Sequence, residues 1–254
     1  MHASSETPLA GPARRLLDWL LPPQCLACGA PTDRPGALCA ECWSAADFIT
    51  DPMCRCCGLP FELAMPGGAV CGACLRDKPA FERARAVMVY DELSRRMILG
   101  LKYGDRTDMA PAFAEWLGRA GAELVTEADW IAPVPLHWTR LFRRRFNQAA
   151  ELARKLARDN GRAYAPDLLV RRRNTPSQAG LNAGGRRRNV RAAFAVKDAW
   201  RTRIAGKRVL VIDDVMTNGA TVSACAKALT GAGAGAVDVL TLARVVRPVG
   251  GETS

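Results

Sequence analysis

Two adjacent carboxylates, Asp213 and Asp214, follow the apolar run "VLVI" and precede a short polar segment that contains a glycine. The apolar run is typical of a strand buried on both faces, and ligands of parallel sheets bind beyond the carboxyl ends of such strands. Residues 216–221 are expected to form the loop into the next helix. There, backbone amides, the hydroxyls of Thr217 and Thr221 and the helix dipole favour an anion.

The loop therefore suits a phosphate, and the two acids suit vicinal hydroxyls or a magnesium ion. Together these groups are complementary to a sugar phosphate. The simpler alternative, an aspartate-capped helix after a core strand, would account for only one acid and one threonine. A dinucleotide-binding site is not favoured, because the sequence lacks the pattern Gly-x-Gly-x-x-Gly.

The cysteines form a second set of residues with chemical potential, because nine of the ten lie before residue 75. Four Cys-x-x-Cys pairs supply two sets of four thiolates, which matches tetrahedral structural zinc. Disulfides and an iron–sulfur cluster are the alternatives, and the pairs could combine sequentially or interleaved. Filling every position with cysteine leaves no open coordination place, so catalytic zinc is not expected. Cys56 is expected to be a bystander, and the expected ligands are Cys25, Cys28, Cys39, Cys42, Cys54, Cys57, Cys71 and Cys74.

Charge is distributed unevenly along the chain, which carries a formal net charge of +11. Residues 140–208 contain 20 Lys and Arg against 4 Asp and Glu, a local +16, so the remainder sums to −5. A positive surface of this density indicates a polyanionic partner, either nucleic acid or a phosphorylated small molecule, although a solvated basic face is the alternative. No apolar run approaches the roughly 18 residues of a membrane span, and a cytoplasmic protein is expected.

Strand-like and helix-like segments alternate in the second part of the chain, which predicts an α/β domain on a mostly parallel sheet flanked by helices. The expected domains are an N-terminal segment with a short amphipathic helix (1–24), a double zinc ribbon (25–79) and the α/β domain (80–250). Strands are predicted over residues 84–90, 130–136, 165–173, 207–215 and 236–246. Helices are predicted over residues 92–103, 110–124, 147–161 and 221–233.

The stretch "VLVIDDVMTNGAT" resembles the phosphoribosyl-pyrophosphate (PRPP) signature of type I phosphoribosyltransferases. More narrowly, the Cys-x-x-Cys array, "LKYGDR", "PVPLHWTRLFRRRFNQA" and "TPSQAGLNAGGRRRNVRAAF" resemble the ComF/GntX family, and the likeness covers nearly the whole chain. The resemblance implies a zinc ribbon followed by a type I phosphoribosyltransferase-like domain that binds PRPP with magnesium. It also implies a link to DNA uptake and natural transformation.

The resemblance assigns roles to individual residues. Asp213 and Asp214 would face the ribose 2′- and 3′-hydroxyls. The loop after "WIAPVPL" would take the pyrophosphate, with Arg145 at a position where the family usually has a glycine, which removes easy access to positive φ. The 5′-phosphate cradle would be Met216, Thr217, Asn218, Gly219, Ala220 and Thr221, the pyrophosphate donors Arg143, Arg144 and Arg145, and the lid residues Gln178, Arg186 and Asn189. A disordered basic loop is the alternative to the lid.

Two functions fit these patterns. The first is a phosphoribosyltransferase whose acceptor the sequence does not identify, with His137 as a candidate base or, alternatively, a surface residue. The second is an accessory protein without catalysis that binds single-stranded DNA through the zinc ribbons and basic loops. Aromatic side chains near those loops could stack on bases or belong to the core; they are Trp138, Phe142 and Phe146.

Overall fold

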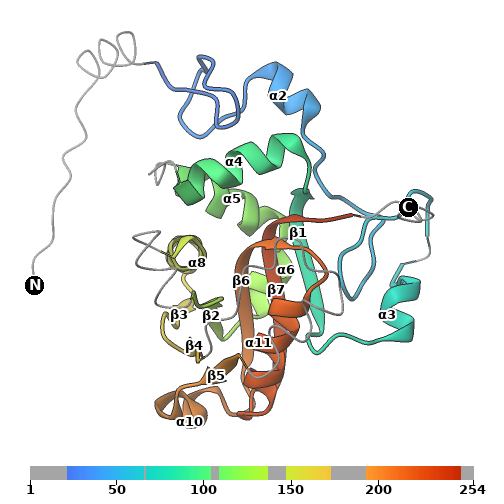
Figure 1. Cartoon of the computed structure of the whole chain (residues 1–254), viewed down its shortest axis with the longest axis vertical. Helices are drawn as coiled ribbons and strands as arrows, with labels where there is room; N and C mark the ends of the chain where they lie inside the picture. Colours follow the sequence, from blue (N-terminus) through green and yellow to red (C-terminus); the bar gives the residue numbers. More distant parts are fainter. Residues whose placement is uncertain (1–21, 66, 104–108, 137–146, 173–192, 247–254) are drawn as a thin grey trace, which may run out of the picture. The chain divides into compact units, whose positions relative to one another are not determined.

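The structure is a computed structural model, and it describes residues 22–65, 67–103, 109–136, 147–172 and 193–246 (Figure 1). The chain divides into two compact units, Met1–Ala46 and Asp47–Ser254. The first unit contains α2 (Ala40–Ala45), and the second contains α3 (Gly72–Arg76) together with the whole sheet. The second set of four cysteines therefore belongs to the same unit as the α/β fold. The domain boundaries after residues 24 and 79 stay predictions.

A five-stranded sheet forms the centre of the second unit, in the order β1-β7-β6-β2-β3. All four neighbouring pairs are parallel. The neighbouring strands β6 and β7 are the longest and are mostly apolar, and β7 is buried along its whole length. These strands confirm the predicted parallel sheet; they are β1 (Arg83–Val89), β2 (Trp130–Pro133), β3 (Ala163–Tyr164), β6 (Arg208–Met216) and β7 (Ala236–Arg244).

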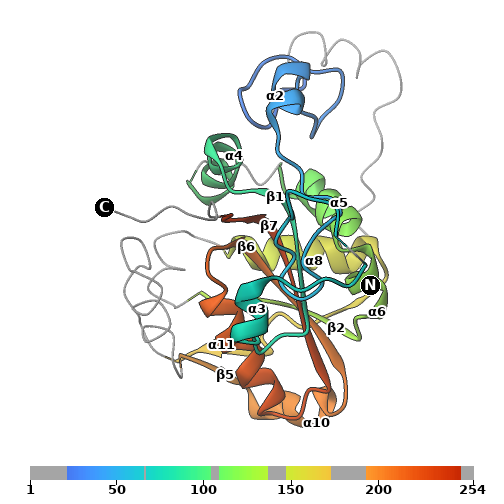
Figure 2. The same ribbon diagram turned by 90° about the vertical axis from the view of Figure 1, so that its right-hand side faces the viewer.

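Helices cover both faces of this sheet (Figure 2). Val209 and Val211 of β6 pack in one cluster with Cys225 and Leu229, which places α11 on that face. Leu240 of β7 points to the other face, where the helices α5, α6 and α8 pack against the strands. The helix bounds are α4 (Glu92–Tyr103), α5 (Ala110–Ala120), α6 (Ala122–Glu127), α8 (Gln148–Asp159) and α11 (Ala220–Thr230).

The single helix predicted over residues 110–124 is wrong, because the structure divides it into α5 and α6 at Gly121. A Cβ atom at this position would lie 2.7 Å from both methyl carbons of Leu240. The glycine thus allows the helix break to approach β7 closely. The constraint comes from tertiary packing, and the local periodicity does not contain it.

A small antiparallel sheet lies beside the main one and pairs β4 (Leu169–Arg171) with β5 (Phe194–Val196). The predicted strand 165–173 is therefore real but shorter, and β3 and β5 were not predicted. After β5 the chain forms η2 (Asp198–Trp200) and α10 (Arg201–Ile204). Within the described ranges no helix is long and apolar enough to cross a membrane.

Candidate functional site

The eight predicted zinc ligands gather in two clusters that pair sequentially. Within each cluster all four sulfur atoms lie within 4.8 Å of one another. The Sγ atoms of Cys28 and Cys39 are 3.7 Å apart, as are those of Cys57 and Cys71. A tetrahedral site with Zn–S bonds of about 2.3 Å places its sulfurs about 3.8 Å apart, whereas a disulfide needs about 2 Å. Both clusters therefore fit structural zinc, and the interleaved pairing is excluded.

Backbone amides point at one buried sulfur in each cluster. Cys25 Sγ accepts from the amide of Cys39 at 3.3 Å, and Cys54 Sγ accepts from the amides of Cys71 at 3.3 Å and Cys57 at 3.5 Å. Burial alone would raise the pKa of these thiols. The amide donors outweigh it and lower the pKa of Cys25 to about 6 and that of Cys54 to about 7. These donors stabilise the thiolate form that zinc requires.

The second zinc ribbon, residues 53–77, is attached to the sheet by backbone contacts. The amide of Ala84 in β1 donates to the carbonyl of Cys56 at 2.7 Å, and the guanidinium of Arg244 in β7 donates to the carbonyl of Cys57. The second cluster consists of Cys54, Cys57, Cys71 and Cys74, so Cys56 lies outside it, as expected. A Cβ atom at Gly58 would lie 2.5 Å from the carbonyl oxygen of Ala84, so the backbones meet closely here.

The strand order changes direction beside the two acids. From β2 the chain crosses through α8 to β3, whereas from β6 it crosses through α11 to β7 on the opposite side. Such a switch between neighbouring parallel strands is where ligands of open α/β sheets bind. Pro133 pairs with Ile212, and the amide of Val134 donates to the Ile212 carbonyl at 2.9 Å. The chain therefore leaves β2 directly beside Asp213.

Asp213 and Asp214 are the last acidic residues of β6, and both are partly exposed. The Asp213 carboxylate accepts from the amide of Asp214 at 2.9 Å. Val209 and Val211 of β6 pack on the α11 face of the sheet, so strand alternation places Asp213 on that face. Burial, and then the negative charge of Asp213, raise the pKa of the fully buried Cys225 thiol of α11, while Arg171 opposes this.

The predicted loop 216–221 is shorter in the structure. Met216 is still paired with Arg244 in the strand ladder, and Ala220 already begins α11. The loop is thus residues 217–219, and Thr221 belongs to the first helical turn. The pairing of β6 with β7 extends beyond the apolar run, and this accounts for the later start of the loop.

Gly219 ends this loop in the left-handed region, with φ 73° and ψ 5°, where a residue with a side chain would be strained. Asn218 Oδ1 accepts from the amide of Ala220 at 3.2 Å, and the amide of Ser223 donates to the Gly219 carbonyl. Met216 is buried at the end of β6. Thr217 is exposed at the loop tip.

The predicted pyrophosphate segment is flanked by two residues that hydrogen-bond to one another. Asn147 caps α8 by accepting from the amide of Ala149 at 3.2 Å, and its Nδ2 donates to the Val134 carbonyl at 3.1 Å. Both flanks of the segment are thereby fixed at the carboxyl end of β2. Several predicted residues lie outside the described ranges; they are Arg143, Arg144, Arg145, His137, Trp138, Phe142, Phe146, Gln178, Arg186 and Asn189.

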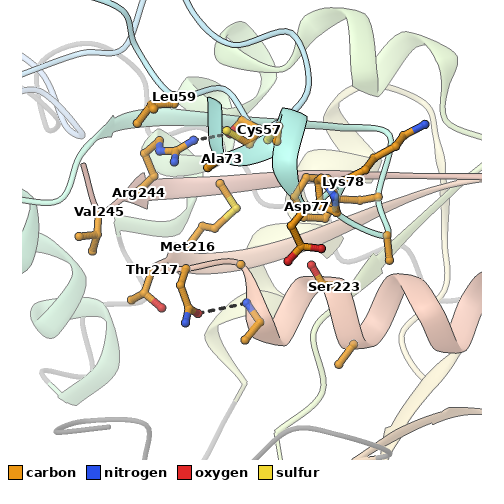
Figure 3. Close-up of a pocket in the computed structure, with 18 of the residues that line it drawn as sticks. Cys57, Leu59, Ala73, Asp77, Lys78, Met216, Thr217, Ser223, Arg244 and Val245 are labelled. Carbon is orange, nitrogen blue, oxygen red and sulfur yellow. Dashed lines mark hydrogen bonds between the residues drawn. The ribbon is translucent and has the colours of Figure 1, made fainter. Parts of the chain in front are cut away.

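Sequence reasoning missed a cavity of about 780 Å³ between the second zinc ribbon and the start of α11 (Figure 3). Its lining includes Cys57 and Leu59 of the ribbon, loop residues 217–219 and Arg244 of β7. The sequence offered one signal for this cavity, the basic residue Arg244 at the end of the apolar stretch "TLARVV". The ribbon residues gave no such signal, because they are distant in sequence.

Comparisons with known proteins identify a matching domain family, related proteins and similar solved structures. Residues 16–75 match the double zinc ribbon domain family. DNA utilization protein YhgH of Salmonella typhimurium is 33% identical over 184 residues, which cover 69% of this chain and 78% of that protein. Competence protein F of Haemophilus influenzae is 29% identical over 187 residues, covering 68% and 78%. Among solved structures, glutamine PRPP amidotransferase from B. subtilis gives a TM-score of 0.36 at 23% identity, covering 57% of this chain and 30% of that one.

Proposed function

Because the chain belongs to the ComF family, we propose that the carboxyl ends of β2 and β6 bind PRPP or a related phosphorylated ribose together with Mg²⁺. The observation that carries this proposal is the meeting of three features at one topological switch point. These are the adjacent acids Asp213 and Asp214, the left-handed Gly219 and the N-terminus of α11. A sugar phosphate needs all three.

In this proposal each part of the edge binds one part of the ligand. Asp213 and Asp214 accept hydrogen bonds from the ribose 2′- and 3′-hydroxyls. The amides of residues 217–221 and the hydroxyls of Thr217 and Thr221 hold the 5′-phosphate, favoured by the dipole of α11. The pyrophosphate is assigned to Arg143, Arg144 and Arg145, because their segment follows β2, and the lid to Gln178, Arg186 and Asn189.

Phosphoribosyl transfer develops positive charge on the ribose ring and negative charge on the departing pyrophosphate. The protein contributes positioning and charge stabilisation at such a centre and needs no covalent nucleophile. Asp213 and Asp214 would hold the ring in place and stabilise its positive charge. Bound Mg²⁺ would neutralise pyrophosphate oxygens, and the acids at this edge of the sheet are ligands of the kind that Mg²⁺ prefers.

Calorimetric titration of zinc-loaded protein with PRPP, with and without Mg²⁺, tests this assignment. Asp213→Asn and Asp214→Asn are each expected to weaken binding by about tenfold or more, since each removes a charge-assisted hydrogen bond. Asp198→Asn, at an exposed acid that begins η2, serves as the matched control. Wild-type protein that fails to bind PRPP would refute the proposal, and a product search with candidate acceptors then separates transfer from binding alone.

A second candidate, an accessory role in handling single-stranded DNA during uptake, is favoured by two observations. The relatives are named for DNA utilization and competence, and residues 140–208 carry a local +16. Lys and Arg contacts to phosphates make the logarithm of affinity fall linearly with that of salt concentration. Measuring affinity for a single strand across salt concentrations tests this role, and a flat dependence would contradict it.

A further inference from the structure

A buried threonine lies directly beside Asp213 in the sheet. Thr241 of β7 is the Cα partner of Asp213 in β6, and neighbouring strands of a sheet are about 4.8 Å apart. Two residues earlier on these strands, Val211 and Val239 are partners, and both pack in one core cluster with Cys225 of α11. Because side chains alternate along a strand, Asp213 and Thr241 lie side by side on that same face.

The hydroxyl of Thr241 is a polar group within an apolar part of the sheet. Thr241 is 0% exposed, and among the described residues its Oγ1 atom has no hydrogen-bond partner. A buried polar atom without a partner is unfavourable, whereas valine has nearly the same shape and carries no polar atom. By itself the hydroxyl therefore lowers the stability of the fold, so its presence beside Asp213 calls for a role in binding.

We propose that Thr241 is a positioning residue for Asp213 and donates its hydroxyl to that carboxylate when a phosphorylated ribose binds. This inference rests on the proposed function. In the structure, Asp213 Oδ1 accepts from the amide of Asp214 at 2.9 Å. A carboxylate offers about four acceptor positions, so the amide, a ribose hydroxyl and Thr241 can donate to it together. Rotation of Thr241 between staggered χ1 positions turns its hydroxyl toward its neighbour.

The surroundings make a donor at this position effective. Cys225, which lies on the same face, is fully buried. Its pKa is raised, first by burial and then by the negative charge of Asp213. Hydrogen bonds in such surroundings are stronger than in water. A donor on the buried side would hold one carboxylate oxygen in place while the other faces the ribose hydroxyls. Because the bond forms only in the complex, its free energy adds to the affinity for the ligand.

Calorimetric titration of full-length, zinc-loaded protein with PRPP and Mg²⁺ tests the inference in two variants. Thr241→Val removes the hydroxyl and keeps the shape, so it should weaken binding by about tenfold without lowering the melting temperature. Thr241→Ser keeps the hydroxyl and loses a buried methyl group, so it should bind within about threefold of wild type while its melting temperature falls. A residue that only fills space would give the opposite ranking.

Thr230→Val is the matched control. It replaces a hydroxyl by a methyl group at the last residue of α11, where Thr230 donates to the Ala226 carbonyl at 3.0 Å. This end of the helix is opposite to the proposed phosphate loop, so the affinity for PRPP should change by less than about twofold.

A double-mutant cycle shows whether Thr241 acts through Asp213. In an Asp213→Ala background, Thr241→Val should change the affinity by less than about twofold, because the carboxylate partner is gone. Wild-type protein that binds no PRPP would refute the proposed function and this inference with it. Three results would overturn the inference alone: wild-type affinity in Thr241→Val, a loss in Thr241→Ser as large as in Thr241→Val, or equal losses in both backgrounds.

Discussion

A methyl group added at Gly58 should detach the second zinc ribbon from the sheet, whereas the same change at Gly29 should not. Each glycine directly follows the second cysteine of a Cys-x-x-Cys pair, and each has positive φ, +67° and +79°. At Gly29 a Cβ atom would meet nothing within 4 Å. At Gly58 it would lie 2.5 Å from the backbone oxygen of Ala84, which cannot move without distorting β1.

The expected cost follows from these contacts. Alanine at positive φ costs about 1 kcal/mol at either position. Gly58→Ala must also push the ribbon away from β1, which breaks the hydrogen bonds from Ala84 to Cys56 and from Arg244 to Cys57, at about 1 kcal/mol each. The sum is about 3 kcal/mol. For a unit of this size it corresponds to a fall of about 6–12 °C in the melting temperature.

Thermal unfolding of the two variants and the wild type, followed by circular dichroism of the α/β unit, measures this difference. Zinc content is determined in parallel, so that loss of metal is distinguished from loss of docking. Gly29→Ala should leave the melting temperature of the sheet unit within about 2 °C, because its strain of about 1 kcal/mol falls in the other compact unit. Equal shifts in both variants, or no shift in Gly58→Ala, would refute the docking of the ribbon on β1.

Two other predictions concern charge and metal. Asp238→Asn should lower the free energy of unfolding, measured by urea denaturation, by about 3–5 kcal/mol. The reason is that the fully buried carboxylate pairs with Arg83 at 2.7 Å and with Arg208 at 2.9 Å. Glu82→Gln, at a half-exposed acid, is the control and should lower it by less than about 1 kcal/mol. Acidification should release zinc from both clusters, because protons compete with the metal for the thiolates that bind it. A zinc-binding dye in Cys39→Ser and Cys74→Ser variants follows release from each cluster, and zinc that stays bound in strong acid would contradict thiolate ligation.

Local patterns predicted most of the fold. The helix over residues 92–103 has the predicted bounds, and the apolar run before Asp213 lies in a buried parallel strand. What failed depended on distant partners. The helix break at Gly121 follows from Leu240, and β5 pairs with the distant β4 in strands of three residues, too short for a periodic signal.

In the candidate site, too, the features set by neighbouring residues were predicted and those set by distant residues were not. Asp213, Asp214 and the loop are contiguous in sequence, so the order of residues alone placed them at one strand end. The loop bounds were wrong at both ends, because the ladder between Met216 and Arg244 extends the strand and α11 already begins at Ala220. The sequence could not predict the cavity, since Cys57 and Arg244 are 187 positions apart.

The two zinc ribbons are alike in sequence but not equivalent in the structure. Only the second ribbon shares a compact unit with the sheet. Its Cys57 carbonyl accepts a hydrogen bond from Arg244, and Arg244 is in turn linked to the proposed phosphate loop. Arg244 pairs with Met216, and Met216 is followed directly by Thr217. If the second ribbon loosened, the buried guanidinium would lose its carbonyl partner, and leaving such a group unsatisfied is costly. Zinc in the second cluster therefore supports the position of the loop.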